Sequence, residues 1–76
     1  MPDIEAINRH LQEQLEIRGL DSVPAVEAAK WLDDAGLLRD RKEGLPLRDL
    51  LRDGEVLGGR QEPPQPYGRW FIDRMK

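Results

Sequence analysis

Apolar residues recur every three or four positions in the first twenty residues. Ile4, Ile7, Leu11 and Leu15 follow the period of a helix that buries one face. Asp3 is suited to cap this helix at its start, and Gly19 to end it. The residues between the apolar positions are expected to form a solvated face: Glu5, Asn8, Arg9, Gln12, Glu13 and Glu16. Such a helix of roughly fifteen residues covers the core or pairs with a second copy of itself, and covering the core is the simpler interpretation.

A second helix is predicted after the interruption at Asp21 and Ser22. Pro24 fits its first turn, where a missing N–H costs nothing, and Gly36 is expected to end it. The buried side is predicted to carry Ala25, Ala28, Ala29 and Leu32. The three alanines suggest a close approach between helices, and Trp31 is expected at the edge of the core.

The remainder of the chain predicts a short helix followed by a β-hairpin. A charged segment, 39–44, reads as a loop, and a third helix then begins at Pro46 and closes at Gly54. Its inward residues are predicted to be Leu47, Leu50 and Leu51, and Asp49 is placed to pair with Arg52.

The hairpin is predicted from two strand-like segments, 55–62 and 69–73, separated by a proline-rich loop over 63–68. Alternation along the second strand places Trp70 and Ile72 on the core face and leaves Phe71 as an exposed aromatic residue. The adjacent Gly58 and Gly59 suggest a bulge or a close backbone approach.

Composition narrows the class of protein. The chain has 76 residues, which is enough for one domain with a small core, and it has no cysteine for a disulfide or a thiolate zinc site. It contains neither a long apolar run nor a basic-then-apolar leader, so we expect a cytoplasmic protein without a membrane partner.

The charge is unevenly distributed. Residues 1–38 hold three basic and eight acidic side chains, a net of −5, whereas residues 39–76 hold nine basic and seven acidic ones, a net of +2. The basic half could face phosphate while the acidic half faces water or a partner, although an ordinary mixed-sign surface explains the same distribution.

Catalytic chemistry is not expected. The single histidine, His10, has no second histidine or cysteine with which to bind a metal. Ser22 is better explained as a residue at a helix start than as a nucleophile, and Gly58–Gly59 lacks the Lys-Ser/Thr sequence of a phosphate loop. We therefore expect no enzyme activity, no metal, no cofactor and no small-molecule ligand.

Three segments in this order resemble the excisionase-type and MerR-like winged helix-turn-helix domains: VEAAKWL at 26–32, LRDLLRDGEVLG at 47–58 and GRWFI at 68–72. The resemblance implies an α+β fold of three helices and a C-terminal β-hairpin wing. It also implies a single domain, 1–76, in which an added helix, 1–20, precedes a winged-helix core, 22–74.

The family resemblance further implies DNA binding, by a small transcriptional regulator or an excisionase-like accessory factor. In a helix-turn-helix the second helix enters the major groove, and the wing contacts the sugar–phosphate backbone or the minor groove. The candidate DNA-binding residues are Arg39, Arg41, Lys42, Arg48, Arg52, Arg60 and Arg69.

A second hypothesis follows from departures from the family pattern. The two helices are joined by a longer connection over 36–45, the wing tip lacks basic residues, and Phe71 stands where the family carries a basic residue. The scaffold could therefore serve as a protein-interaction adaptor, through Tyr67 and Phe71 or through the first helix, with a second protein or a second copy of this chain as partner. A domain without DNA binding is the remaining alternative.

Overall fold

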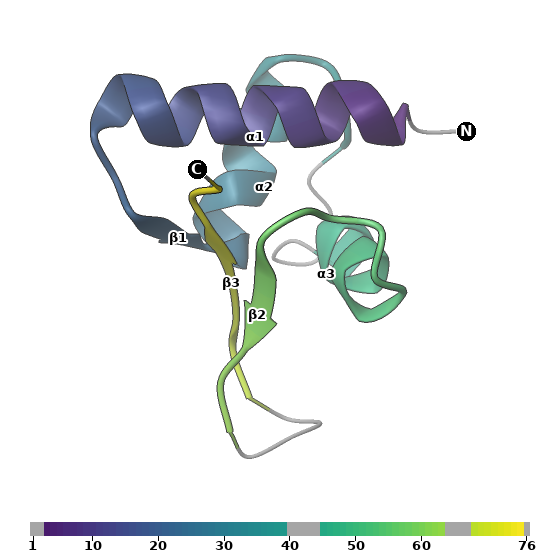
Figure 1. Ribbon diagram of the computed structural model, residues 1–76. Helices are drawn as coiled ribbons and strands as arrows, with labels where there is room; N and C mark the ends of the chain where they lie inside the picture. The colour runs from purple at the N-terminus through teal and green to yellow at the C-terminus, as the bar shows by residue number, and fades with distance from the viewer. Residues whose placement is uncertain (1–2, 40–44, 64–67, 76) are drawn as a thin grey trace.

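The computed structural model describes residues 3–39, 45–63 and 68–75. In chain order the elements are α1 (Ile4–Arg18), β1 (Ser22–Pro24), α2 (Ala25–Asp34), α3 (Leu45–Arg52), β2 (Gly59–Gln61) and β3 (Trp70–Asp73) (Figure 1). The described part of the chain is thus a small α+β domain with three helices and a three-stranded antiparallel sheet, as the α+β prediction required.

The sheet contains one strand that the sequence analysis did not predict. Its order is β1-β3-β2, so β3 is central and pairs with both neighbours, with Val23 and Gly59 both opposite Ile72. The prediction that Pro24 lies in the first turn of the second helix is wrong, because Pro24 is extended and ends β1, and α2 begins at Ala25. An edge strand tolerates proline, and burial of Val23 against β3 provides the reason for pairing.

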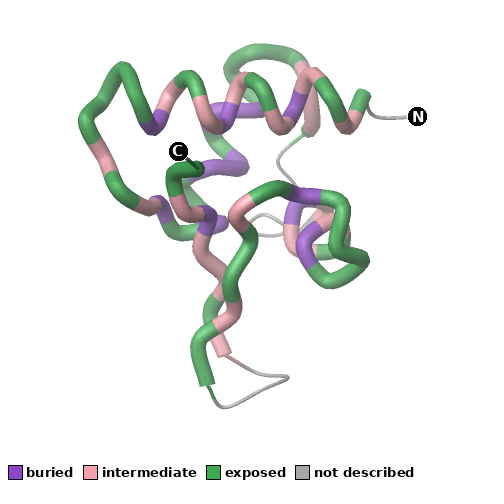
Figure 2. Tube along the Cα trace, viewed as in Figure 1, coloured by how far each residue is buried: buried purple, intermediate pink, exposed green. Residues whose placement is uncertain are grey.

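The core lies between α1, α2, α3 and the sheet. The fully buried side chains include Ile7, Leu11, Leu15, Val23, Leu32, Leu47 and Ile72, and in Figure 2 the buried parts of α1 face the rest of the molecule. Trp31 is more buried than predicted, at 8% exposed. Trp70 is only partly buried, although it packs against the core on the same side of β3 as Ile72.

All three described helices end in the same hydrogen-bond pattern. At the end of α1, Gly19 has a φ of 67°, its N–H donates to the Glu16 carbonyl at 3.1 Å, and the Leu20 N–H donates to the Leu15 carbonyl at 2.9 Å. This is the Schellman motif, in which a left-handed residue satisfies the last helical carbonyls. Equivalent bonds occur after α2 and α3, so the predicted glycine stops are confirmed.

The paired glycines before β2 allow a close backbone approach, as predicted. The Gly58 carbonyl accepts a hydrogen bond from the Asp73 N–H at 2.8 Å. A Cβ atom on Gly58 would collide with the Asp73 carbonyl, and one on Gly59 would lie 2.7 Å from a methyl carbon of Leu51. A side chain at Gly58 is therefore excluded by the backbone of β3, whereas one at Gly59 would require Leu51 to shift.

Two side-chain amides attach α1 to the hairpin. Asn8 donates to the Glu55 carbonyl at 3.1 Å and accepts from the Leu57 N–H at 2.9 Å. Gln12, one turn later, donates to the Asp73 carbonyl at 3.2 Å and accepts from the Met75 N–H at 2.7 Å. The expectation that Asn8 and Gln12 belong to a solvated face is wrong, because these amides satisfy backbone groups at the ends of the hairpin.

Candidate nucleic-acid interface

Helix α3 carries two of the candidate arginines. Its apolar side is formed by Leu47 and Leu51, which are 0% and 4% exposed, while Leu50 is partly buried. Because Leu47 and Leu51 point inward, the charged positions next to them lie toward the surface: Arg52 is exposed and Arg48 is partly buried.

Arg52 forms the ion pair that its spacing predicted. Its Nη1 lies 3.6 Å from Oδ1 of Asp49, and the two side chains are 68% and 56% exposed. An exposed pair of this kind contributes at most about 1 kcal/mol, so a phosphate could replace the carboxylate at little cost.

Arg60 on β2 is engaged within the sheet. Its Nε donates to Oδ2 of Asp73 at 2.9 Å, and its Nη2 donates to Oδ1 at 3.2 Å. The guanidinium also lies 5.2 Å from the centre of the Phe71 ring. The hydrogen bond and the charge of Asp73 raise the pKa of Arg60 above its usual value.

Phe71 is not the exposed aromatic residue that the sequence predicted. It is partly buried, opposite Pro24 on β1 and Arg60 on β2, with the Arg60 guanidinium over its ring. The strand alternation was right in placing Phe71 away from Ile72, but it gave no information about the arginine on the neighbouring strand. Tyr67, the other predicted protein contact, lies outside the described residues.

The remaining candidates are distributed over two segments. Arg39 is exposed after α2, and Arg69 is exposed just before β3, where its carbonyl accepts from the Glu62 N–H at 2.9 Å. Arg41 and Lys42 lie outside the described residues. The fold brings Arg60 together with Asp73 and Phe71, whereas Arg52 and Arg69 reach solvent from α3 and from the hairpin, which both lie below α1 in Figure 1.

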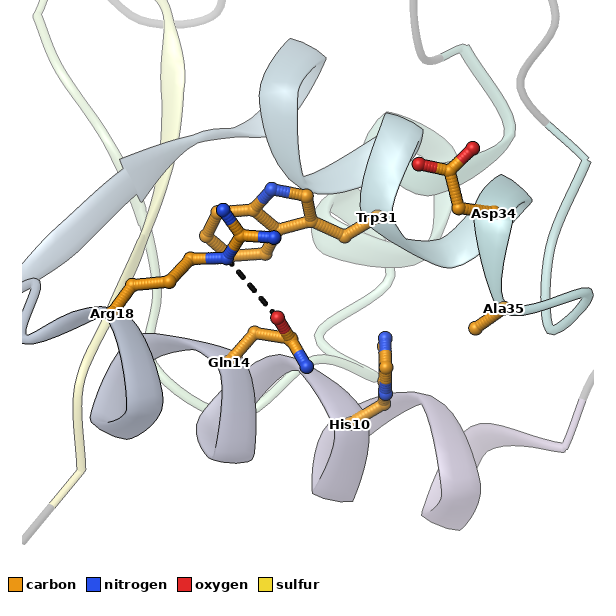
Figure 3. A pocket seen from close by; sticks show the side chains of 6 residues that line it. All are labelled: His10, Gln14, Arg18, Trp31, Asp34 and Ala35. Atoms are coloured by element: carbon orange, nitrogen blue, oxygen red, sulfur yellow. Dashed lines mark hydrogen bonds between the residues drawn. The ribbon is translucent and has the colours of Figure 1, made fainter.

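A hollow of about 250 Å³ lies between α1 and α2, lined by His10, Gln14, Arg18, Trp31, Asp34 and Ala35 (Figure 3). Three of the side chains that line it contact one another. The Arg18 guanidinium lies 4.8 Å from the centre of the Trp31 ring, and its Nε donates to Oε1 of Gln14 at 3.1 Å. Among the described residues no group of three or more His, Cys, Asp or Glu side chains is placed to hold a metal ion.

The roles of Asn8 and Gln12, whose amides bind the ends of the hairpin, were not predicted. A signal was present, because two amide side chains four residues apart flank the apolar stripe. That spacing does not reveal which backbone groups, 47 to 63 residues later in the chain, the amides will meet.

None of the helices in the described ranges has the length and apolar character needed to cross a membrane. Comparison of the chain with models of known protein families, with curated proteins and with solved structures gives no match.

Proposed function

We propose that this protein is a DNA-binding domain of the winged helix-turn-helix type. The observation that carries the proposal is the element order α1-β1-α2-α3-β2-β3 combined with the strand order β1-β3-β2. This arrangement sets α3, the second helix of an α2–α3 unit, beside a two-stranded hairpin (Figure 1). A helix-turn-helix uses its second helix to enter the major groove, which assigns that role to α3.

Exposed positive charges support the same assignment. Arg52 on α3 and Arg69 at the base of β3 are exposed cations, and Arg39 adds a third after α2. Arg60 serves to stiffen the hairpin through Asp73 and Phe71. The protein would act as a small regulator or as an accessory factor of the excisionase type, in the cytoplasm, and as a binding protein rather than an enzyme.

The proposal is tested by fluorescence anisotropy with a mixed-sequence DNA duplex over a series of salt concentrations. We expect binding at low salt that weakens as salt rises, with a slope of about −0.9 per phosphate neutralised. Arg52→Glu should weaken binding by about tenfold or more, because it replaces a phosphate contact with a repulsive charge.

A matched control is available on α1. Arg9 on α1 pairs with Glu5 at 3.6 Å and is 66% exposed, so its setting closely copies that of Arg52. Arg9→Glu makes the same change in net charge and should leave the affinity within about twofold, after allowance for long-range repulsion. Absence of binding at every salt concentration, or equal losses in the two variants, would refute the assignment of α3.

A further inference from the structure

Two exposed apolar side chains sit on backbone that α1 holds in place. Leu57 is 56% exposed and Met75 is 54% exposed. The Leu57 N–H donates to the side-chain oxygen of Asn8 at 2.9 Å, and the Met75 N–H donates to that of Gln12 at 2.7 Å. The structure therefore restricts the chain at two positions where large apolar groups face water, although exposed apolar residues at segment ends are usually free to move.

The spacing of the two side chains follows from the helix. Asn8 and Gln12 are four residues apart on α1, a rise of about 6 Å along its axis. The backbone amides of Leu57 and Met75, which bind these side chains, are consequently held about one helical turn apart along α1. This is the separation of apolar residues three or four positions apart on a second helix lying alongside α1.

The surface around them has two hollows whose lining carries one more carboxylate than cations. Leu57 borders a hollow of about 390 Å³, Met75 borders one of about 270 Å³, and Gln12 and Glu16 line both. The charged residues of the two hollows are Glu5, Glu13 and Glu16 with Arg9 and Arg74. Arg9 already pairs with Glu5, which leaves the carboxylates of Glu13 and Glu16 against the single cation of Arg74.

We infer that this surface, the α1 strip (Asn8, Gln12, Leu57 and Met75 with Glu13 and Glu16), docks a basic amphipathic helix of a partner protein. The apolar residues of the partner would pack on Leu57 and Met75, and its lysines or arginines would face Glu13 and Glu16. A nucleic acid is excluded as occupant because its phosphates would meet these carboxylates. The inference does not depend on DNA binding, since the α1 strip contains none of the candidate DNA-binding arginines.

The test uses a defined probe, the model helix acetyl-LKKLLKLLKKLLKL-amide, below the concentration at which it self-associates. Titration followed by calorimetry and by ¹⁵N–¹H spectra should show saturable binding. The resonances that shift should be the backbone amides of Leu57 and Met75 and the side-chain amides of Asn8 and Gln12. The same peptide with every lysine replaced by glutamate should not bind.

Variants of the protein locate the site. Leu57→Gln with Met75→Gln should weaken binding by about tenfold or more, because it removes both apolar contacts. Its matched control is Ile17→Gln, which removes an apolar side chain that is 74% exposed on α1 but does not line either hollow. Glu13→Lys with Glu16→Lys should weaken binding similarly, and Glu27→Lys with Asp33→Lys, two exposed acids on α2, should not.

The outcomes separate the possible occupants. The inference is supported if the lysine peptide binds and the strip variants weaken that binding more than their controls do. It is overturned by absence of binding, by equal binding of the glutamate peptide, or by equal losses in the strip variants and their controls. Sedimentation that shows a dimer of this chain, dissociated by Leu57→Gln with Met75→Gln, would identify a second copy as the occupant and would also overturn the assignment to a foreign helix.

Discussion

Helices α1 and α3 differ in how firmly the rest of the molecule holds them. Helix α1 has fifteen residues, an Asp3 cap, three fully buried side chains and two amides bonded to the hairpin. Helix α3 has eight residues and two buried leucines, and its Arg52 pairs only with another exposed side chain. Helix α1 is therefore attached to the rest of the molecule more firmly than α3, whose exposed side chains can change at little cost to folding.

The largest expected effect comes from a cavity under α1. Leu11 is fully buried, so Leu11→Ala should lower the free energy of unfolding by about 2–5 kcal/mol, measured by urea denaturation followed by circular dichroism. Leu57→Ala is the control, because Leu57 is 56% exposed and its truncation should cost less than about 0.5 kcal/mol. Similar losses in the two variants would contradict the burial of α1.

The next largest effect is expected where the backbone before β2 approaches β3 closely. Gly54 and Gly58 have the same φ of 77°, but only Gly58 has backbone within reach of an added Cβ. Gly54→Ala should cost about 1–2 kcal/mol from its backbone conformation alone. Gly58→Ala should cost more, because Asp73 must also move, and equal costs in thermal unfolding would argue against the packing of the hairpin.

A smaller effect is expected when the side-chain amide that joins α1 to the hairpin is removed. Gln12→Ala removes both bonds to the end of β3 and should lower the free energy of unfolding by about 1 kcal/mol. The Met75 amide should also exchange faster with solvent. Gln14→Ala, which removes only a bond to the side chain of Arg18, should change neither the stability nor the Met75 exchange by a comparable amount.

The smallest effect on the free energy of unfolding is expected when the surface ion pairs of the two helices are removed. Arg9→Ala and Arg52→Ala each remove an exposed pair of 3.6 Å, and each should change the free energy of unfolding by less than about 0.5 kcal/mol. A loss above about 1 kcal/mol for Arg52→Ala would show that α3 depends on its charges for folding.

The helices were predictable because their signals are local. The apolar spacing in α1, the alanines of α2 and the leucines of α3 lie on the buried sides that were expected, and each helix ends at the expected glycine. The hairpin was placed correctly, but its first strand was predicted too long, since only Gly59–Gln61 pairs with β3. Ladder pairing depends on the partner strand, which local alternation does not identify.

The candidate site was less predictable than the fold. Exposed Arg39, Arg52 and Arg69 could be anticipated from the charged character of their segments. The engagement of Arg60 with Asp73 and Phe71 could not, because it requires the register of β2 against β3. Until that register is known, an arginine in a strand is equally compatible with a contact to solvent, to a ligand or to a neighbouring strand.

By itself, then, the sequence determined the number of helices, their buried faces and their ends, because spacing, caps and glycine stops act within a few residues. Tertiary structure alone decided that residues 22–24 form an edge strand, that Asn8 and Gln12 bind the hairpin, and that Phe71 lies beneath Arg60. Each of these depends on groups far apart in the chain. Backbone and side-chain partners at that distance are chosen by the packing of the whole domain, which no local pattern encodes.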